Sequence, residues 1–300
     1  MPCYHPLTAY RSSNGAVFFT QLKRNGGGDT LQLPCGQCIG CRLERSRQWA
    51  IRCMHEAQMN QQNCFLTLTY ADENLPKNNS LCYRDFQNFM KRYRKAIHPD
   101  KIRFYMCGEY GEKTDRPHYH ACIFGHDFND KTYHSKTATG FKIYTSTLLD
   151  RLWHHGHASI GCVSFETAAY VARYVMKKVN GQAAESYYER LDTTTGEIIR
   201  IEPEFAHMSL KPGIGASWLE KYQDDIYPNG LVVVNGVEVK PPKYYDKKYK
   251  KSDFDNHELI LYRRYQDGKK NYHDNIDERL AVKEIVTAAK VKQLKRSQEI

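Results

Sequence analysis

The sequence lacks the features of membrane-embedded and secreted proteins. No apolar run approaches the roughly 20 residues that a helix needs to cross a bilayer. The first residues, MPCYHPLTAY, are too polar for a signal peptide, and internal repeats are also missing. We therefore expect a chain that stays in a reducing cytoplasm, where its ten cysteines are thiols or metal ligands rather than disulfides.

Acidic residues are too few to balance the basic ones. The 44 Lys and Arg residues exceed the 34 Asp and Glu residues, which gives a formal net charge of +10. Such a chain usually binds a polyanion, most often nucleic acid, and aromatic residues interleaved with the basic runs favour that interpretation over a merely soluble basic surface. Hydrophobic residues make up 41% of the 300 residues, enough for the core of one large or two modest domains.

Hydrophobic periodicity predicts an α+β domain with a mainly antiparallel sheet. In chain order we expect a strand at 64–71, a helix at 83–97, strands at 101–110 and 118–125, a helix near 146–155, a strand at 158–165 and a helix at 166–179. Residues 126–146 are expected to form a polar insertion. The helix at 83–97 has the clearest apolar stripe: Phe86, Phe89, Met90 and Tyr93.

Composition divides the chain into three parts. Residues 1–60 are a cysteine-rich segment with a basic helix, residues 61–182 hold the predicted α+β domain, and residues 183–300 form an irregular, basic C-terminal extension. The extension contains LVVVNGVEVK, which predicts a hairpin that turns at Asn235 and Gly236. We expect the extension to contact DNA or a partner protein.

Two histidines flank an aromatic residue in RPHYHACIFG, residues 116–125. Because side chains alternate across a strand, His118 and His120 point to the same face. Two imidazoles on one face can bind one divalent cation, although such a pair alone is a weak signal. A second pair, His155 and His157 in HHGH, contains glycine and is interpreted as a turn.

A third metal ligand is expected from the preceding strand, which ends in CGEYG. If this strand and the histidine strand pair through the segment 110–117, Glu109 comes close to His118. A carboxylate and two imidazoles leave positions open for a substrate oxygen, as in a catalytic metal site. Glu112 and Asp115 are the competing donors, and a surface salt bridge is the alternative role of Glu109.

Tyr170 and Tyr174 share one face of the helix that ends the domain, with Cβ atoms roughly 5–6 Å apart, and Lys177 and Lys178 lie about one turn on. Aromatic packing is the ordinary role of such a pair, and a second tyrosine pair in PPKYYDKKYKK provides a comparison. A tyrosine ionises only near pH ~10, but its hydroxyl can attack a phosphodiester when a cation stabilises the developing charge. The prediction of a metal site and the prediction of a nucleophilic tyrosine pair therefore strengthen each other.

Cys35, Cys38 and Cys41 form a C-x₂-C-x₂-C pattern, typical of a zinc site, with Cys3 or His5 as the fourth ligand. The second C-x₂-C pair of a zinc ribbon is missing, so an iron–sulfur cluster and buried free thiols stay open. The other cysteines are expected in the core: Cys53, Cys64, Cys82, Cys107, Cys122 and Cys162.

Three segments in this order, FLTLTY, GEYG…RPHYH and YVARYVMKK, resemble the HUH endonuclease superfamily of rolling-circle replication initiators. PCGQCIGCR, SLKPGIGASWLEKY and PPKYYDKKY are similar to its microvirus members, the gokushovirus branch above all. The resemblance covers about residues 35–250 and implies an RRM- or ferredoxin-like core. It implies that His118 and His120 bind Mg²⁺ or Mn²⁺, that Tyr170 and Tyr174 are the nucleophiles, and that Lys177 or Lys178 is the lysine that follows them.

The resemblance also implies a reaction: nicking of one strand at a viral origin on supercoiled circular DNA, through a 5′-phosphotyrosine, and later rejoining. Its implied partners are origin DNA, a host helicase and a host DNA polymerase, in the host cytoplasm. The tyrosine pair argues against single-tyrosine relaxases, and the missing G-x-x-x-x-G-K-[ST] motif argues against initiators with their own helicase. The alternatives are a non-catalytic zinc-containing DNA-binding protein and a metallohydrolase of small phosphate esters.

Overall fold

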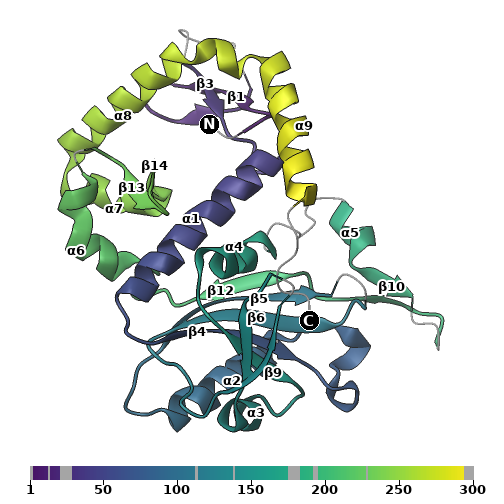
Figure 1. Ribbon diagram of the computed structural model, residues 1–300. Coiled ribbons are helices and arrows are strands. Elements are labelled where there is room, and N and C mark those ends of the chain that lie inside the picture. The colour runs from purple at the N-terminus through teal and green to yellow at the C-terminus, as the bar shows by residue number, and fades with distance from the viewer. Residues whose placement is uncertain are drawn as a thin grey trace. The chain divides into compact units, whose positions relative to one another are not determined.

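The computed structural model describes residues 3–12, 14–20, 29–111, 114–137, 139–174, 183–191, 195–227 and 229–293. The chain forms two compact units (Figure 1). Of the described residues, the larger unit comprises Ser46–His257, and the smaller one comprises those before Ser46 together with those from Glu258 to Gln293. Two helices, α1 (Ile39–Gln58) and α8 (Phe254–Lys270), have residues in both units.

A seven-stranded antiparallel sheet forms the centre of the larger unit. Its order is β12 (Phe205–Met208), β5 (Arg103–Tyr110), β6 (Pro117–Phe124), β4 (Asn63–Thr69), β9 (Ala158–Gly161), β8 (Lys142–Thr145) and β7 (Thr132–Lys136). The predicted α+β class with a mainly antiparallel sheet is confirmed. The sequence did not indicate β12, nor the β7–β8 hairpin within the segment expected to be a polar insertion.

The two faces of the sheet carry different side chains because residues alternate along each strand. On one face, Tyr119, Ala121 and Ile123 of β6 join the main core with α2 (Tyr83–Ala96) and α3 (Thr147–Trp153), and α2 buries its predicted stripe. On the other face, Cys122 and Phe124 pack in a second core with residues of α1 and α4 (Phe165–Tyr174). The alternation therefore leaves His118 and His120 on the face that α4 covers (Figure 1).

Residues after 182 add further elements to the larger unit. In chain order they include α5 (Ala183–Tyr187), β10 (Glu189–Leu191), β11 (Ile198–Arg200), α6 (Ala216–Ile226), β13 (Val232–Val234), β14 (Val237–Val239) and α7 (Lys243–Ser252). Tyr188 and Ile201 are part of the main core. The predicted β13–β14 hairpin is confirmed, and Asn235 and Gly236 form its turn with the positive φ angles that a tight hairpin requires.

The structure corrects one expectation about burial and adds a contact that the sequence did not indicate. Cys162 is exposed, so its predicted place in the core is wrong, whereas Cys53, Cys64, Cys107 and Cys122 are buried as expected. Arg52, a residue of the predicted basic helix, packs between two aromatic rings. Its guanidinium carbon lies 4.0 Å from the ring centroids of both Trp49 and Tyr244, so its charge is used within the fold.

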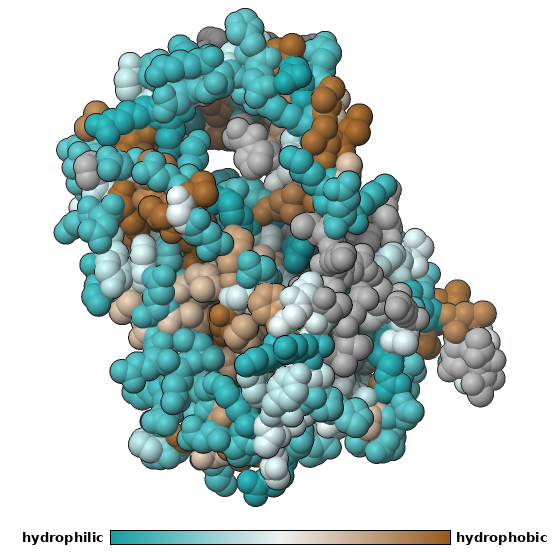
Figure 2. Space-filling model, in the orientation of Figure 1, coloured by the Kyte–Doolittle hydropathy of each residue, from teal (hydrophilic) through white to brown (hydrophobic). Residues whose placement is uncertain are grey.

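The smaller unit contains a three-stranded sheet with the order β2 (Val17–Phe18), β1 (Leu7–Arg11) and β3 (Asp29–Leu33), and the helix α9 (Asp277–Gln293). Among its described residues, the buried hydrophobic side chains are Cys3, Ala9, Ile260 and Leu280. Figure 2 shows hydrophobic residues on the surface of α9, where Val282, Ile285 and Val286 are exposed. This unit therefore has a very small core.

In the part of the chain that the structure describes, no helix has both the length and the hydrophobicity that crossing a membrane requires.

The loop before β9 depends on a close backbone approach at Gly156. A Cβ atom at this position would lie 2.3 Å from the backbone nitrogen of Ala71 and 2.5 Å from the backbone oxygen of Thr69. We expect Gly156→Ala to lower the free energy of unfolding by about 1–3 kcal/mol, because backbone atoms must move to admit the methyl group. Urea denaturation followed by circular dichroism measures this change.

Gly161→Ala in β9 is the matched control. Its added Cβ would lie 3.7 Å from Cδ1 of Phe65, an ordinary contact, so we expect a change within about 0.5 kcal/mol. Equal unfolding midpoints for the two variants would show that the loop tolerates a side chain at Gly156.

Candidate active site

Pairing between β5 and β6 places Glu109 directly opposite His118. The hairpin predicted from the sequence is therefore present, and Tyr110 and Pro117 form its last pair. On the other side of β6, β4 places Thr67 opposite His120. Because paired residues and residues two apart share a face, these four side chains gather on one side of the sheet.

Glu109, His118 and His120 form a compact group of three potential metal ligands. The Oε1 atom of Glu109 lies 2.8 Å from Nε2 of His118 and 2.9 Å from Nε2 of His120, and the ligand atoms all lie within 4.8 Å of one another. Glu109 is 1% exposed and His120 is 2% exposed. Of the competing donors, Asp115 is exposed and outside this group, and Glu112 lies outside the described residues.

Hydrogen bonds at the far side of each ring turn both Nε2 atoms toward the carboxylate. Nδ1 of His118 lies 3.1 Å from the backbone oxygen of Arg116, and because a carbonyl can only accept, this nitrogen donates. Nδ1 of His120 lies 3.0 Å from Oγ1 of Thr67. Such contacts are the usual way in which a protein orients histidines toward a metal.

The protonation states of Glu109 and His120 also suit the binding of a cation. Burial alone would raise the pKa of Glu109, but the contacts with His118 and His120 outweigh it and lower that pKa, so the carboxylate is charged. Burial lowers the pKa of His120, although Glu109 opposes this change, so its imidazole is neutral. The Oε2 atom of Glu109 is buried without a hydrogen-bond partner among the described residues. A charged carboxylate with an unsatisfied oxygen beside imidazole nitrogens fits a divalent cation.

Tyr170 lies on α4 directly over this group. Its hydroxyl is 3.4 Å from Oε1 of Glu109, and its ring stands at 88° to the ring of His120 with the centroids 5.0 Å apart. Tyr174 is the last described residue of α4, one turn further on. The side chain of Tyr174, and Lys177 and Lys178 as a whole, lie outside the described residues.

The comparison pair of tyrosines has a different environment. Tyr245 and Tyr249, four residues apart on α7, are both buried. The hydroxyl of Tyr245 is 3.0 Å from Nδ1 of His55, and the ring of Tyr249 stacks on Tyr227 with the centroids 3.8 Å apart. Tyr170 is also buried, at 7% exposed, but unlike this pair it lines a cleft.

This cleft has a volume of about 800 Å³, and Glu109, His118, His120 and Tyr170 lie along its wall. Arg116, His134 and His157 add polar or basic groups to the same wall. Sequence analysis missed His134 and His157. The HHGH segment is a loop as expected, but only the pairing of β4 with β9 brings it to the cleft, and His134 comes from the unpredicted hairpin.

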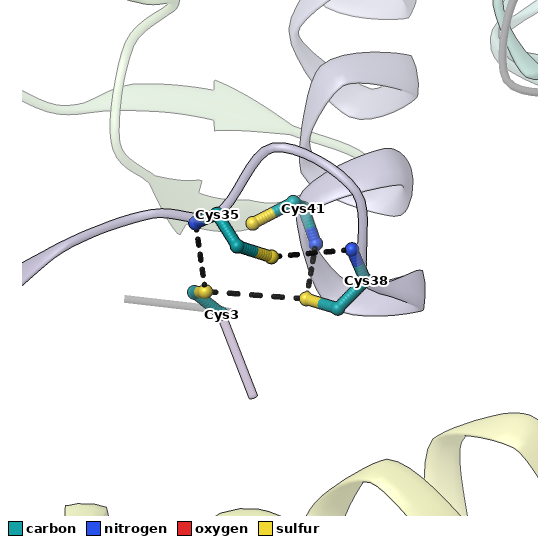
Figure 3. A group of neighbouring side chains, drawn as sticks. All are labelled: Cys3, Cys35, Cys38 and Cys41. Carbon is teal, nitrogen blue, oxygen red and sulfur yellow. Dashed lines mark hydrogen bonds between the residues drawn. The ribbon is translucent and has the colours of Figure 1, made fainter. Parts of the chain in front are cut away.

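A second ligand group lies in the smaller unit, where Cys3, Cys35, Cys38 and Cys41 come together (Figure 3). Cys3 rather than His5 joins the three predicted cysteines, because the His5 imidazole pairs with Glu284, 2.7 Å away. The structure therefore resolves the choice of fourth residue that the sequence left open.

Comparison with known proteins gives the following relatives. The family model described as replication-associated protein ORF2/G2P matches residues 63–179. The chain is 36% identical over 261 residues to the replication-associated protein VP4 of Bdellovibrio phage phiMH2K, covering 84% of this chain and 78% of that protein. It is 29% identical over 272 residues to the replication-associated protein ORF2 of Spiroplasma virus 4 (83% and 80% covered), and 30% identical over 237 residues to the replication-associated protein ORF4 of Chlamydia phage 1 (74% and 56% covered). No solved structure matches.

Thr67 should act as a positioning residue for His120. Thr67→Val removes the hydroxyl that contacts Nδ1 of His120, so we expect the Kd for Mn²⁺ to rise about 10-fold. Isothermal titration calorimetry of the purified chain measures this affinity.

Thr69→Val is the control, because Thr69 also lines the cleft but its hydroxyl donates to the backbone oxygen of His157. We expect its Mn²⁺ affinity to stay within about twofold of the unchanged chain. Unaltered affinity in the Thr67 variant would mean that this contact does not orient His120.

Proposed function

The chain belongs to the family of phage replication-associated proteins that the ORF2/G2P model describes, and we propose that it starts and ends rolling-circle replication by cutting and rejoining one strand of phage origin DNA. A role in phage replication follows from the family itself. The strand-transfer chemistry is the proposed part, and it is supported by the arrangement of side chains in the cleft.

One observation carries the proposal: the hydroxyl of Tyr170 lies beside a carboxylate and two imidazoles on the wall of an open cleft. A tyrosine that only packs does not need its hydroxyl near such a group. Phosphodiester cleavage does need both parts, a nucleophile and a fixed positive charge close to the phosphoryl oxygens.

In the proposed reaction, Oη of Tyr170 attacks the phosphorus of the scissile phosphodiester. A bond forms between this oxygen and phosphorus, and the bond from phosphorus to the 3′-oxygen breaks. The 3′-oxygen leaves as a hydroxyl, so a proton passes in net from the tyrosine to the leaving group. A Mg²⁺ or Mn²⁺ ion held by Glu109, His118 and His120 would supply the positive charge.

Rejoining requires a second nucleophile, and Tyr174 is the proposed one. After a round of synthesis, one tyrosine cuts the regenerated origin while the other still carries the 5′-phosphate. The newly freed 3′-hydroxyl then attacks the first phosphotyrosine, which closes a circle and restores the tyrosine. The phosphotyrosine keeps the energy of the broken bond, so neither step needs ATP. Lys177 or Lys178 would add phosphate contacts.

The proposed substrate is origin DNA, both as the supercoiled replicative form and as a single strand. The net charge of +10 and the basic groups Arg116, His134 and His157 along the cleft suit a phosphate backbone. Replication from the freed 3′-hydroxyl would require a host DNA polymerase and a host helicase, and hence the host cytoplasm.

A non-catalytic DNA-binding protein is the alternative, and the four-cysteine group favours it to the extent that such sites are common in DNA-binding modules. This alternative gives no function to the group of Glu109, His118 and His120, or to the hydroxyl of Tyr170. The two functions differ in whether a covalent protein–DNA product forms.

A nicking assay tests the proposal. Supercoiled DNA with the cognate origin and Mn²⁺ should give a nicked circle and a protein–DNA adduct that survives a denaturing gel. Replacing both Tyr170 and Tyr174 with Phe should lower adduct formation by about 10³-fold or more, because no nucleophile is left. His118→Ala should also abolish it, and the single tyrosine variants will show whether the two are interchangeable.

Tyr245→Phe together with Tyr249→Phe is the matched control, since this pair has the same helical spacing but lies away from the cleft. It should keep full adduct formation. An adduct that persists without Tyr170 and Tyr174 would contradict the assignment of the nucleophiles. Tight DNA binding by the unchanged chain with no nick or adduct would establish the non-catalytic alternative.

A further inference from the structure

The four sulfur atoms of Cys3, Cys35, Cys38 and Cys41 face one another across a common centre (Figure 3). They all lie within 4.8 Å of one another, and Sγ of Cys3 is 4.0 Å from Sγ of Cys38. Zinc binds thiolates at about 2.3 Å in a tetrahedron, which puts pairs of sulfurs about 3.8 Å apart. The Cys3–Cys38 separation is therefore close to that of two ligands of a single ion, and the 4.8 Å limit keeps the other sulfurs near the same range.

The same distances distinguish the other uses of these thiols. A disulfide requires sulfurs about 2.05 Å apart, and all four cysteines are free. An iron–sulfur cluster spaces its cysteines more widely, because several irons and sulfides lie between them. A single tetrahedral ion fits the group better than either.

Backbone N–H groups around the cluster donate to the sulfurs, as expected for thiolates that carry negative charge. Cys3 accepts from the nitrogen of Cys35, Cys35 accepts from those of Gln37 and Cys38, and Cys38 accepts from those of Tyr4 and Cys41, over 3.3–3.5 Å. Gly36 permits the tight turn between Cys35 and Cys38 through its φ of +75°. These contacts prearrange the donors.

Cys38 also caps the first helix. It immediately precedes α1, and its sulfur accepts from the backbone nitrogen of Cys41 in the first turn, the usual contact of a helix N-cap. The first turn of α1 contains no acidic residue, so negatively charged sulfurs are the groups here that complement the positive helix N-terminus. The cluster thus joins the start of the chain, the end of the N-terminal sheet and the start of α1.

The small core of this unit explains why a metal that links its segments would be needed. Its buried hydrophobic residues are few, whereas many large apolar side chains among its described residues are exposed, among them Leu259, Tyr262, Tyr265, Ile285 and Val286. Small units with little buried apolar surface usually need a metal or disulfides to fold. We propose that Cys3, Cys35, Cys38 and Cys41 bind one structural Zn²⁺ ion that holds the smaller unit together.

Metal analysis of the full chain, purified under reducing conditions, tests the site. We expect about one zinc ion per chain, with neither iron nor inorganic sulfide. The double variant Cys38→Ser, Cys41→Ser should lose most of this zinc. Cobalt added to metal-free chain should give the absorption bands of tetrahedral thiolate coordination, a readout that does not depend on whether the serine variant folds.

Two variants control for the location of the ion. Cys162→Ser removes an exposed cysteine outside the group, and His118→Ala alters the separate candidate site, so both should keep their zinc. Zinc-free protein whose four thiols react freely with a thiol reagent would overturn the proposal. Iron with inorganic sulfide, or zinc retained by the Cys38, Cys41 variant, would overturn it as well.

Hydrogen exchange tests the structural role. Removing zinc with a chelator should raise amide exchange in β1, β3 and α9 by about 10-fold or more, because the metal contributes folding free energy. Exchange in β4, β5 and β6 of the larger unit should stay the same. Unchanged exchange in the N-terminal sheet after zinc removal would show that the ion does not hold this unit together. Zinc content does not depend on strand nicking, so the outcome of these tests is independent of the proposed function.

Discussion

The register between β5 and β6 is the constraint on which the candidate site depends. A slip of one residue would turn Glu109 to the opposite face, away from His118 and His120. The register is held from the other side of the sheet, where Tyr119, Ala121 and Ile123 are buried under α2 and α3. Hydrophobic burial on one face therefore fixes the polar chemistry on the other, and the ligand group needs no flexible loop to assemble.

This arrangement carries a cost in stability. A carboxylate that is 1% exposed loses its hydration, and Oε1 of Glu109 regains contacts from two imidazoles while Oε2 has no hydrogen-bond partner among the described residues. A side chain selected for folding alone would be apolar at this position, as its neighbours in the second core are. The unsatisfied oxygen is thus itself an argument that the group is kept for binding a cation.

The sequence predicted most of the elements of the sheet and its clearest helix because their apolar periodicity is strong. It also predicted the contact of Glu109 with His118, since a short hairpin allows few registers. Features that depend on tertiary partners were not predictable. Short edge strands such as β7 and β12 have little pattern of their own. One of the two rings that contact Arg52, that of Tyr244, is distant in sequence, and Cys3 lies 32 residues before Cys35. The chemistry of Tyr174, Lys177 and Lys178 stays a prediction.

Helix geometry constrains how the two proposed nucleophiles would share one cation. Tyr170 and Tyr174 lie one turn apart on α4, which separates their backbones by about 6 Å along the helix axis. In the structure the hydroxyl of Tyr170 lies beside Glu109. Under the proposed function, exchange of roles then requires the second tyrosine and the scissile phosphate to come together at the same ligand group. The strand β6 is packed on both faces, so under the proposed function the rearrangement concerns the tyrosines or the DNA rather than the ligands.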